Sequence, residues 1–173
     1  MAENDDAPVV NVAALRRDIY RLVVLLLADE RVAEVAAFRD LADSESNHES
    51  EVSRLLIWVS IACRQLLNIK EHHTKTTTCG RFCRDYPRVA WGDLTFVAAC
   101  SAVIHAVELL PFDLPEDDDQ APARRRYTGT ITIRGRARGN RLGTRAVVDF
   151  PRFAECCVLL SDDYLRSERD ANK

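Results

Sequence analysis

The sequence lacks an apolar run long enough to cross a membrane. A spanning helix needs about 18 or more consecutive apolar residues, and the most hydrophobic block, residues 22–28, is far shorter. The acidic first eight residues also lack the basic segment with which a signal peptide begins. We therefore expect a cytoplasmic protein that does not act on a membrane.

Glycine-rich nucleotide-binding motifs are missing as well. The chain has six glycines in 173 residues and contains neither a phosphate-binding loop nor a dinucleotide-binding fingerprint, so we predict no cofactor. The length suffices for one domain with a hydrophobic core. We expect a disordered tail over residues 1–10, a single domain over residues 11–166 and a frayed end over residues 167–173.

One segment lacks acidic residues and lysine altogether. Residues 121–148 contain eight arginines, whereas the whole chain has a net charge of −3, so the segment carries +8 and the remainder −11. Arginine binds phosphate through paired hydrogen bonds, and the segment therefore predicts contact with RNA or another phosphate-bearing ligand. The alternative is that these arginines pair with the acidic remainder. The predicted nucleic-acid-binding residues are Arg124, Arg125, Arg126, Arg134, Arg136, Arg138, Arg141 and Arg145.

The histidines and cysteines do not form a strong metal-binding motif. In an intracellular protein, most of the six cysteines are expected to be reduced and to pack as small apolar side chains. Zinc binds imidazole and thiolate, but a Cys-x3-Cys spacing is a weak signature, and two neighbouring histidines point apart on a regular backbone. We therefore predict no metal site. The set considered is His72, His73, Cys79 and Cys83.

Helical periodicity dominates the rest of the chain. Apolar residues recur every three or four positions over residues 12–41 (one helix or two, with Asn11 as its cap), 49–69, 91–110 and 151–166. Residues 126–134 and 144–150 read as two strands joined by a glycine-rich turn, and residues 70–88 read as a loop. The predicted fold class is mainly α: a four- or five-helix bundle with a β-hairpin at about residues 126–150, inserted before the last helix.

A histidine interrupts the most apolar stretch, residues 91–110. His105 lies four positions after Ser101, so a continuous helix places both on the same side. A histidine on an apolar helix is most simply a hydrogen-bonded core residue. The pattern alone favours that interpretation over a functional one.

Three motifs in a fixed order resemble a known family. Residues 98–106 read AACSAVIHA, residues 61–68 read IACRQLLN, and residues 127–153 form a glycine-bearing hairpin that leads into a helix. In this order they resemble a bacterial helical family, with a CNKIIHA-type helix, that is associated with the HEPN superfamily (higher eukaryotes and prokaryotes nucleotide-binding). The resemblance covers about residues 50–160.

The resemblance implies a dimeric helical bundle and, in many members, a metal-independent endoribonuclease of toxin–antitoxin or phage-defence systems. In that family the RNA 2′-hydroxyl attacks, while a histidine and an arginine act on the phosphate. His105 matches the family histidine, Ser101 stands at the asparagine position, and Val97 stands where the usual arginine lies. Arg64 matches an arginine of the earlier helix. The implied catalytic set is His105 as acid or base, Arg64 as the charge-stabilising group, and Ser101.

Two functions of different classes follow. The first is a HEPN-like module that engages RNA, with endoribonuclease activity as its catalytic form, and that forms a homodimer. The alternative is a non-catalytic interaction or scaffold module that dimerises or docks on a protein partner. Salt separates the two, because phosphate binding weakens steeply with salt concentration and apolar association does not.

Overall fold

The structure is a computed structural model that describes residues 10–34, 45–84, 86, 90–111, 127–135 and 143–171. Its helices are α1 (Val12–Glu34), α3 (Glu45–Ile69), α4 (Phe96–Ile104) and α5 (Phe150–Ala171), with a short 3-10 helix, η2 (His73–Thr76). The strands within these ranges are β1 (Thr78–Cys83), β2 (Gly92–Thr95), β3 (Glu108–Leu110), β4 (Thr130–Arg134) and β5 (Arg145–Asp149). They form a single antiparallel sheet in the order β2-β1-β5-β4-β3.

The predicted fold class was wrong, because the protein is an α+β fold with a five-stranded sheet in its described part. The segment over residues 70–88, which we predicted to be a loop, contains β1, an inner strand that lies between β2 and β5. The stretch over residues 91–110, predicted to be one helix, is helical only from Phe96 to Ile104 and has a strand on either side. Both flanking strands are too short to display the two-residue alternation that identifies a strand.

Long-range pairing explains why this apolar stretch divides. β2 pairs with β1, and β3 pairs with β4, which lies more than twenty residues further along the chain. Helical periodicity is a local preference, and hydrogen bonds to a distant strand override it. At the junction between β2 and α4, the N–H of Phe96 donates to the carbonyl of Thr77, the residue before β1, at 2.8 Å, so a distant segment fixes the first residue of the helix.

Three local predictions agree with the structure, whereas α3 begins at Glu45, four residues before its predicted start. The side chain of Asn11 accepts a hydrogen bond from the N–H of Ala14 at 2.9 Å, as expected for the cap of α1. β4 and β5 form the predicted hairpin, and Pro151 lies in the first turn of α5. α5 continues to Ala171, past residue 167, where we expected the chain to fray.

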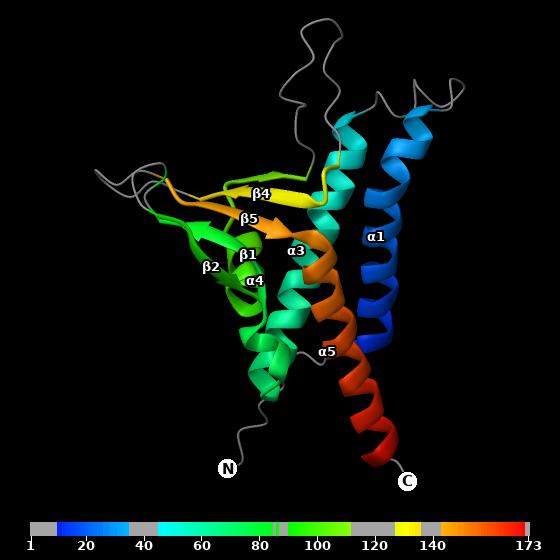
Figure 1. Ribbon diagram of the computed structural model, residues 1–173. Helices are drawn as coiled ribbons and strands as arrows, with labels where there is room; N and C mark the ends of the chain where they lie inside the picture. Colours follow the sequence, from blue (N-terminus) through cyan, green and yellow to red (C-terminus); the bar gives the residue numbers. More distant parts are fainter. Residues whose placement is uncertain are drawn as a thin grey trace, which may run out of the picture.

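The helices cover one face of the sheet. α1, α3 and α5 lie side by side, and α4 lies between α3 and the sheet (Figure 1). One core joins the helices to the inner face of β4 and β5, and the rings of Phe96 and Phe153 connect α4 to α5 with centroids 5.3 Å apart. The sheet therefore has an inner face toward α4 and an outer face that carries the alternate residues of each strand.

Helix α3 is long and apolar enough, by length and composition, to cross a membrane over His48–Ile69. Half of that window is buried inside the protein. The buried residues include Leu55, Val59 and Leu66, which belong to the common core. The core helix of a soluble protein passes the same test of length and composition, so this single helix is weak evidence for a membrane span.

All six cysteines are buried, reduced thiols. Burial raises the pKa of the Cys100 and Cys157 thiols, so both stay protonated. Because burial keeps the reagent away from all six thiols, we expect the folded protein to show no fast reaction with Ellman's reagent, whereas the denatured chain should release six equivalents. Rapid labelling of one or more thiols in the folded protein would contradict the buried arrangement.

Candidate functional site

A cavity of about 380 Å³ lies between α4 and the inner face of the sheet. Its sheet side is formed by Phe82, Ala146 and Ile133, which are register neighbours across β1, β5 and β4. Its helix side includes Ser101 and His105. The wall is therefore mostly apolar, with a hydroxyl and an imidazole on the α4 side, as is typical of small-ligand sites.

The interpretation of His105 as a buried core residue was wrong. His105 is exposed and lies just beyond the last residue of α4, where its N–H donates to the carbonyl of Ser101 at 3.1 Å. The helix ends there because the chain turns into β3, so the side chain leaves the packed interior. The imidazole is thus available to solvent at the wall of the cavity.

Arg64 of α3 is held against α4. Its Nη1 donates to the Ser101 hydroxyl and to the Val97 carbonyl, the latter at 3.2 Å. The Ser101 hydroxyl in turn donates to the Val97 carbonyl at 3.0 Å. The guanidinium therefore contacts the backbone of Val97, the residue that stands where the resemblance expects an arginine, although Arg64 comes from another helix.

The predicted catalytic set is only partly assembled. Ser101 contacts Arg64 and also lines the cavity with His105. Within the described residues, no hydrogen bond or ion pair joins Arg64 to His105 directly. A phosphate in contact with both groups would have to lie next to Ser101.

Two of the eight predicted RNA-binding arginines fall within the described residues. Arg134 and Arg145 are directly opposed in register, at the ends of β4 and β5 that adjoin residues 136–142. Arg134 forms an ion pair with Glu108 at 3.0 Å, as expected if arginines of this segment pair with acidic residues of the same chain rather than with phosphate. The other six lie outside the described residues: Arg124, Arg125, Arg126, Arg136, Arg138 and Arg141.

Arg145 belongs to a row of stacked side chains, which we call the arginine–aromatic row. Its guanidinium carbon lies 4.9 Å from the centre of the Tyr86 ring, and that of Arg81 lies 4.8 Å from the Trp91 ring. The two rings meet edge to face with centroids 5.9 Å apart. The order of the row is thus Arg81, Trp91, Tyr86 and Arg145.

The row belongs to the outer face of the sheet. Arg81 and Arg145 each precede a residue that lines the inner cavity, Phe82 and Ala146, so their own side chains point the other way. Neither arginine has a hydrogen bond or ion pair within the described part of the chain, and the Nε of Arg145 is buried without a partner. Among the described residues, the N–H groups of these two guanidiniums therefore have no hydrogen-bond acceptor.

Sequence reasoning missed three members of this row. Arg81, Tyr86 and Trp91 lie outside the arginine-rich segment and join Arg145 only when β1 pairs with β5. A signal was present, because residues 81–91 interleave arginines with aromatic residues. That interleaving is typical of nucleic-acid-binding surfaces.

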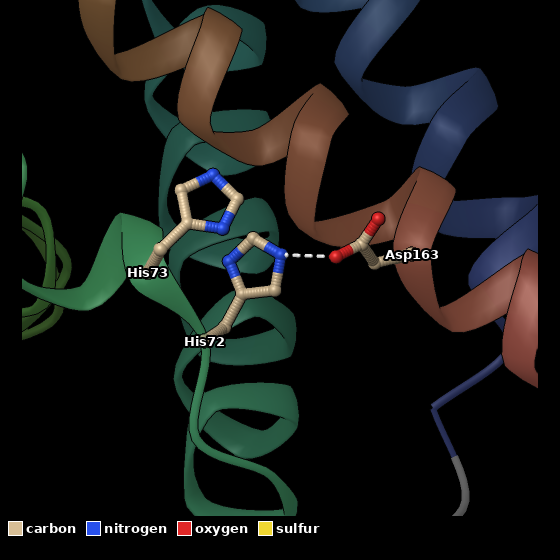
Figure 2. Close-up of side chains that lie close together, drawn as sticks. All are labelled: His72, His73 and Asp163. Carbon is tan, nitrogen blue, oxygen red and sulfur yellow. Dashed lines mark hydrogen bonds and ion pairs between the residues drawn. The ribbon is translucent and has the colours of Figure 1, made fainter.

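The histidine pair adopts a different arrangement from the one predicted. His72 and His73 lie on the same side of the backbone, with ring centroids 4.2 Å apart, and Asp163 of α5 approaches them (Figure 2). The Nε2 of His72 is 2.8 Å from the Oδ2 of Asp163, and this hydrogen bond lowers the pKa of the Asp163 carboxyl. Cys79 and Cys83 are buried and are not part of this group.

Comparisons with protein-family models, with curated proteins and with solved structures give no match. A function for this chain therefore has to be inferred from its own residues and their contacts.

Proposed function

We propose that the protein is a cytoplasmic, HEPN-like module that engages RNA through the outer face of its sheet. The observation that carries the proposal is the arginine–aromatic row. Guanidiniums stacked on aromatic rings keep their N–H edges available for phosphate, and exposed rings or guanidinium planes accept stacked bases. The row adjoins residues 136–142, which contribute three further arginines by sequence.

The row suits an unpaired strand better than a duplex. Base faces are accessible for stacking only where the nucleotides are not stacked within a helix. Two arginines that lie beside two aromatic rings can contact successive phosphates and bases of one strand. We therefore take single-stranded RNA as the ligand.

Endoribonuclease activity is the second candidate function, and it depends on the α4 cavity. His105 is exposed at its wall, as an acid or base that reaches a bound phosphate must be. Arg64 is held one helical turn earlier through Ser101, where it could stabilise negative charge on the phosphate. The exposure of His105 and the nearby position of Arg64 support the proposal that His105 plays the role of the family's catalytic histidine.

An exposed apolar stripe on α1 supports the homodimer. Tyr20, Val24 and Leu27 are exposed at helical spacing along that helix, and Trp58 of the neighbouring α3 is 48% exposed. Aromatic and aliphatic side chains on one helical face are typical of dimer interfaces. The alternative function, a non-catalytic scaffold or protein-docking module, would use the same surface without RNA.

The test is RNA binding by the double variant Arg81→Glu/Arg145→Glu, measured by fluorescence anisotropy with a single-stranded RNA. Losing two charge-assisted contacts of about 1.5 kcal/mol each should weaken binding by about 100-fold. The slope of log affinity against log salt should become less steep by about 1.4, because two fewer phosphates are neutralised.

The matched control is Arg166→Glu/Arg169→Glu, which makes the same charge change at exposed positions of α5. This control should bind RNA within a few-fold of the unmodified protein. Equal losses in both double variants would mean that only net charge matters. RNA binding that is undetectable in the unmodified protein at low salt would favour the scaffold alternative.

A further inference from the structure

Two imidazoles and a carboxylate converge where η2 meets α5. His72 and His73 come from the segment that follows α3, and Asp163 comes from α5 (Figure 2). One ligand atom from each of the three residues lies within 4.8 Å of the others. Nitrogen and oxygen ligands around a tetrahedral zinc ion lie about 3.4 Å apart, so a small rotation of an exposed side chain suffices to bring the three to one ion.

We propose that His72, His73 and Asp163 form a binding site for a divalent transition metal, with Zn²⁺ as the preferred ion. Two neutral imidazoles and one carboxylate form a ligand set that suits zinc, and with three protein ligands a fourth position stays open. The site uses none of the residues of the arginine–aromatic row or of the α4 cavity.

The backbone explains why two neighbouring histidines face the same way. His72 is extended, with φ −137° and ψ 141°, and acts as the N-cap of η2, whereas His73 is the first residue of that 3-10 helix. The change from extended to helical backbone between them removes the alternation that would separate their side chains. Both rings therefore face α5.

His72 is already oriented as metal-binding histidines usually are. Its ring is buried, and its Nδ1 lies 2.8 Å from the Thr74 hydroxyl, which fixes the ring with Nε2 toward Asp163. Thr74 is itself 1% exposed and is held within η2. Hydrogen bonds from the second ring nitrogen typically position such ligands.

The hydrogen balance at His72 can be followed atom by atom. Without metal, the Thr74 N–H donates to Nδ1 at 3.2 Å, so Nε2 carries the ring hydrogen and donates it to Asp163. When Zn²⁺ binds Nε2, the Nε2 proton leaves to solvent and Nδ1 takes up a proton from solvent. Nδ1 then donates to the Thr74 hydroxyl, and the bond from the Thr74 N–H to Nδ1 is lost. The imidazole stays neutral, and the metal replaces the hydrogen that lay between the two ligands.

The other two ligands leave access for an ion. His73 is exposed, and its ring nitrogens have no hydrogen-bond partner within the described residues. Asp163 is partly exposed, with its Oδ1 3.9 Å from Arg166, whose side chain is 74% exposed and can move away. The two elements are held together nearby, since the Tyr164 hydroxyl donates to the Leu66 carbonyl at 2.5 Å.

The test is a titration of the full chain with Zn²⁺ by calorimetry, with Co²⁺ as a spectroscopic probe. The unmodified protein should bind one ion, and His73→Ala and Asp163→Asn should each weaken binding by at least about 10-fold. Thr74→Val, which removes only the positioning hydroxyl, should weaken it by about 10-fold. His105→Ala is the control, because it removes an exposed histidine outside the group and should leave binding unchanged.

The Co²⁺ spectrum separates this site from the buried thiols. Nitrogen and oxygen ligands give weak visible bands without the strong thiolate charge-transfer absorption that a cysteine ligand produces. The proposal is overturned if the unmodified protein binds no ion, if the His73 and Asp163 variants bind as tightly as the His105 variant, or if thiolate bands appear. Because His73 is exposed, its replacement should leave the thermal melting curve unchanged.

Discussion

Replacing His105 by alanine is expected to lower the rate of RNA cleavage by about 10²–10⁴-fold, which is the usual contribution of a general acid or base. His105 is exposed and lies beyond the end of α4, so the fold should not depend on it. The measurement is the cleavage rate of a single-stranded RNA in the presence of a chelator. Circular dichroism and the melting temperature of the variant should match those of the unmodified protein.

Two further variants sharpen this result. His73→Ala removes an exposed histidine outside the cavity and should cleave RNA at the unmodified rate. Arg64→Lys keeps a positive charge but replaces the planar guanidinium, which suits phosphate, by a single ammonium, so its rate should fall as well. If the unmodified protein binds RNA without cleaving it, or if the His105 variant cleaves at the full rate, the proposed endoribonuclease activity is rejected. RNA binding would then remain as the proposed function.

Replacing Gly80 by alanine is expected to destabilise the fold by about 2–4 kcal/mol, because backbone strain and overpacking act together at this residue. Gly80 has φ of +151°, and a Cβ placed there would lie 2.1 Å from the Val147 carbonyl oxygen. That oxygen belongs to β5, which pairs with β1 at this point, so relief requires the two strands to separate. The measurement is the free energy of unfolding in urea.

Alanine variants of two other glycines distinguish the effect of backbone strain from that of overpacking. Gly129 has φ of +87°, but a Cβ placed there would meet nothing within 4 Å, so its replacement by alanine should cost only the backbone strain, about 1 kcal/mol. Gly92 has an ordinary φ, and its nearest neighbour would lie 4.0 Å away, so alanine there should change stability by less than about 0.5 kcal/mol. If all three variants were equally stable, the close approach of β1 and β5 would be wrong.

The α4 region shows where local pattern stops being informative. The apolar spacing over residues 91–110 correctly indicated a buried helix, since Phe96, Ala99, Cys100 and Val103 are buried in α4. The same spacing predicted that the helix continued through His105. β3 pairs with β4 instead, and this pairing placed His105 at an exposed helix end rather than in the core.

The arginine-rich segment shows the same division for the candidate surface. Its composition predicted phosphate binding, which stays a prediction, and its alternation predicted the β4–β5 hairpin, which the structure confirms. Arg134 and Arg145 nevertheless have different surroundings, since one pairs with Glu108 and the other stacks on Tyr86. Composition cannot distinguish an arginine paired with a carboxylate from one stacked on an aromatic ring, because the partners come from distant segments of the chain.

The sequence by itself determined the elements whose signals are local: the capped start of α1, the end of α3 at Ile69, the hairpin, and the proline-marked start of α5. Only the tertiary structure decided the five-stranded sheet, the exposure of His105, the arginine–aromatic row and the approach of Asp163 to the two histidines. The physical reason is common to all four. Each depends on hydrogen bonds or contacts between segments far apart in the chain, and their geometry exists only after the sheet and helices have packed together.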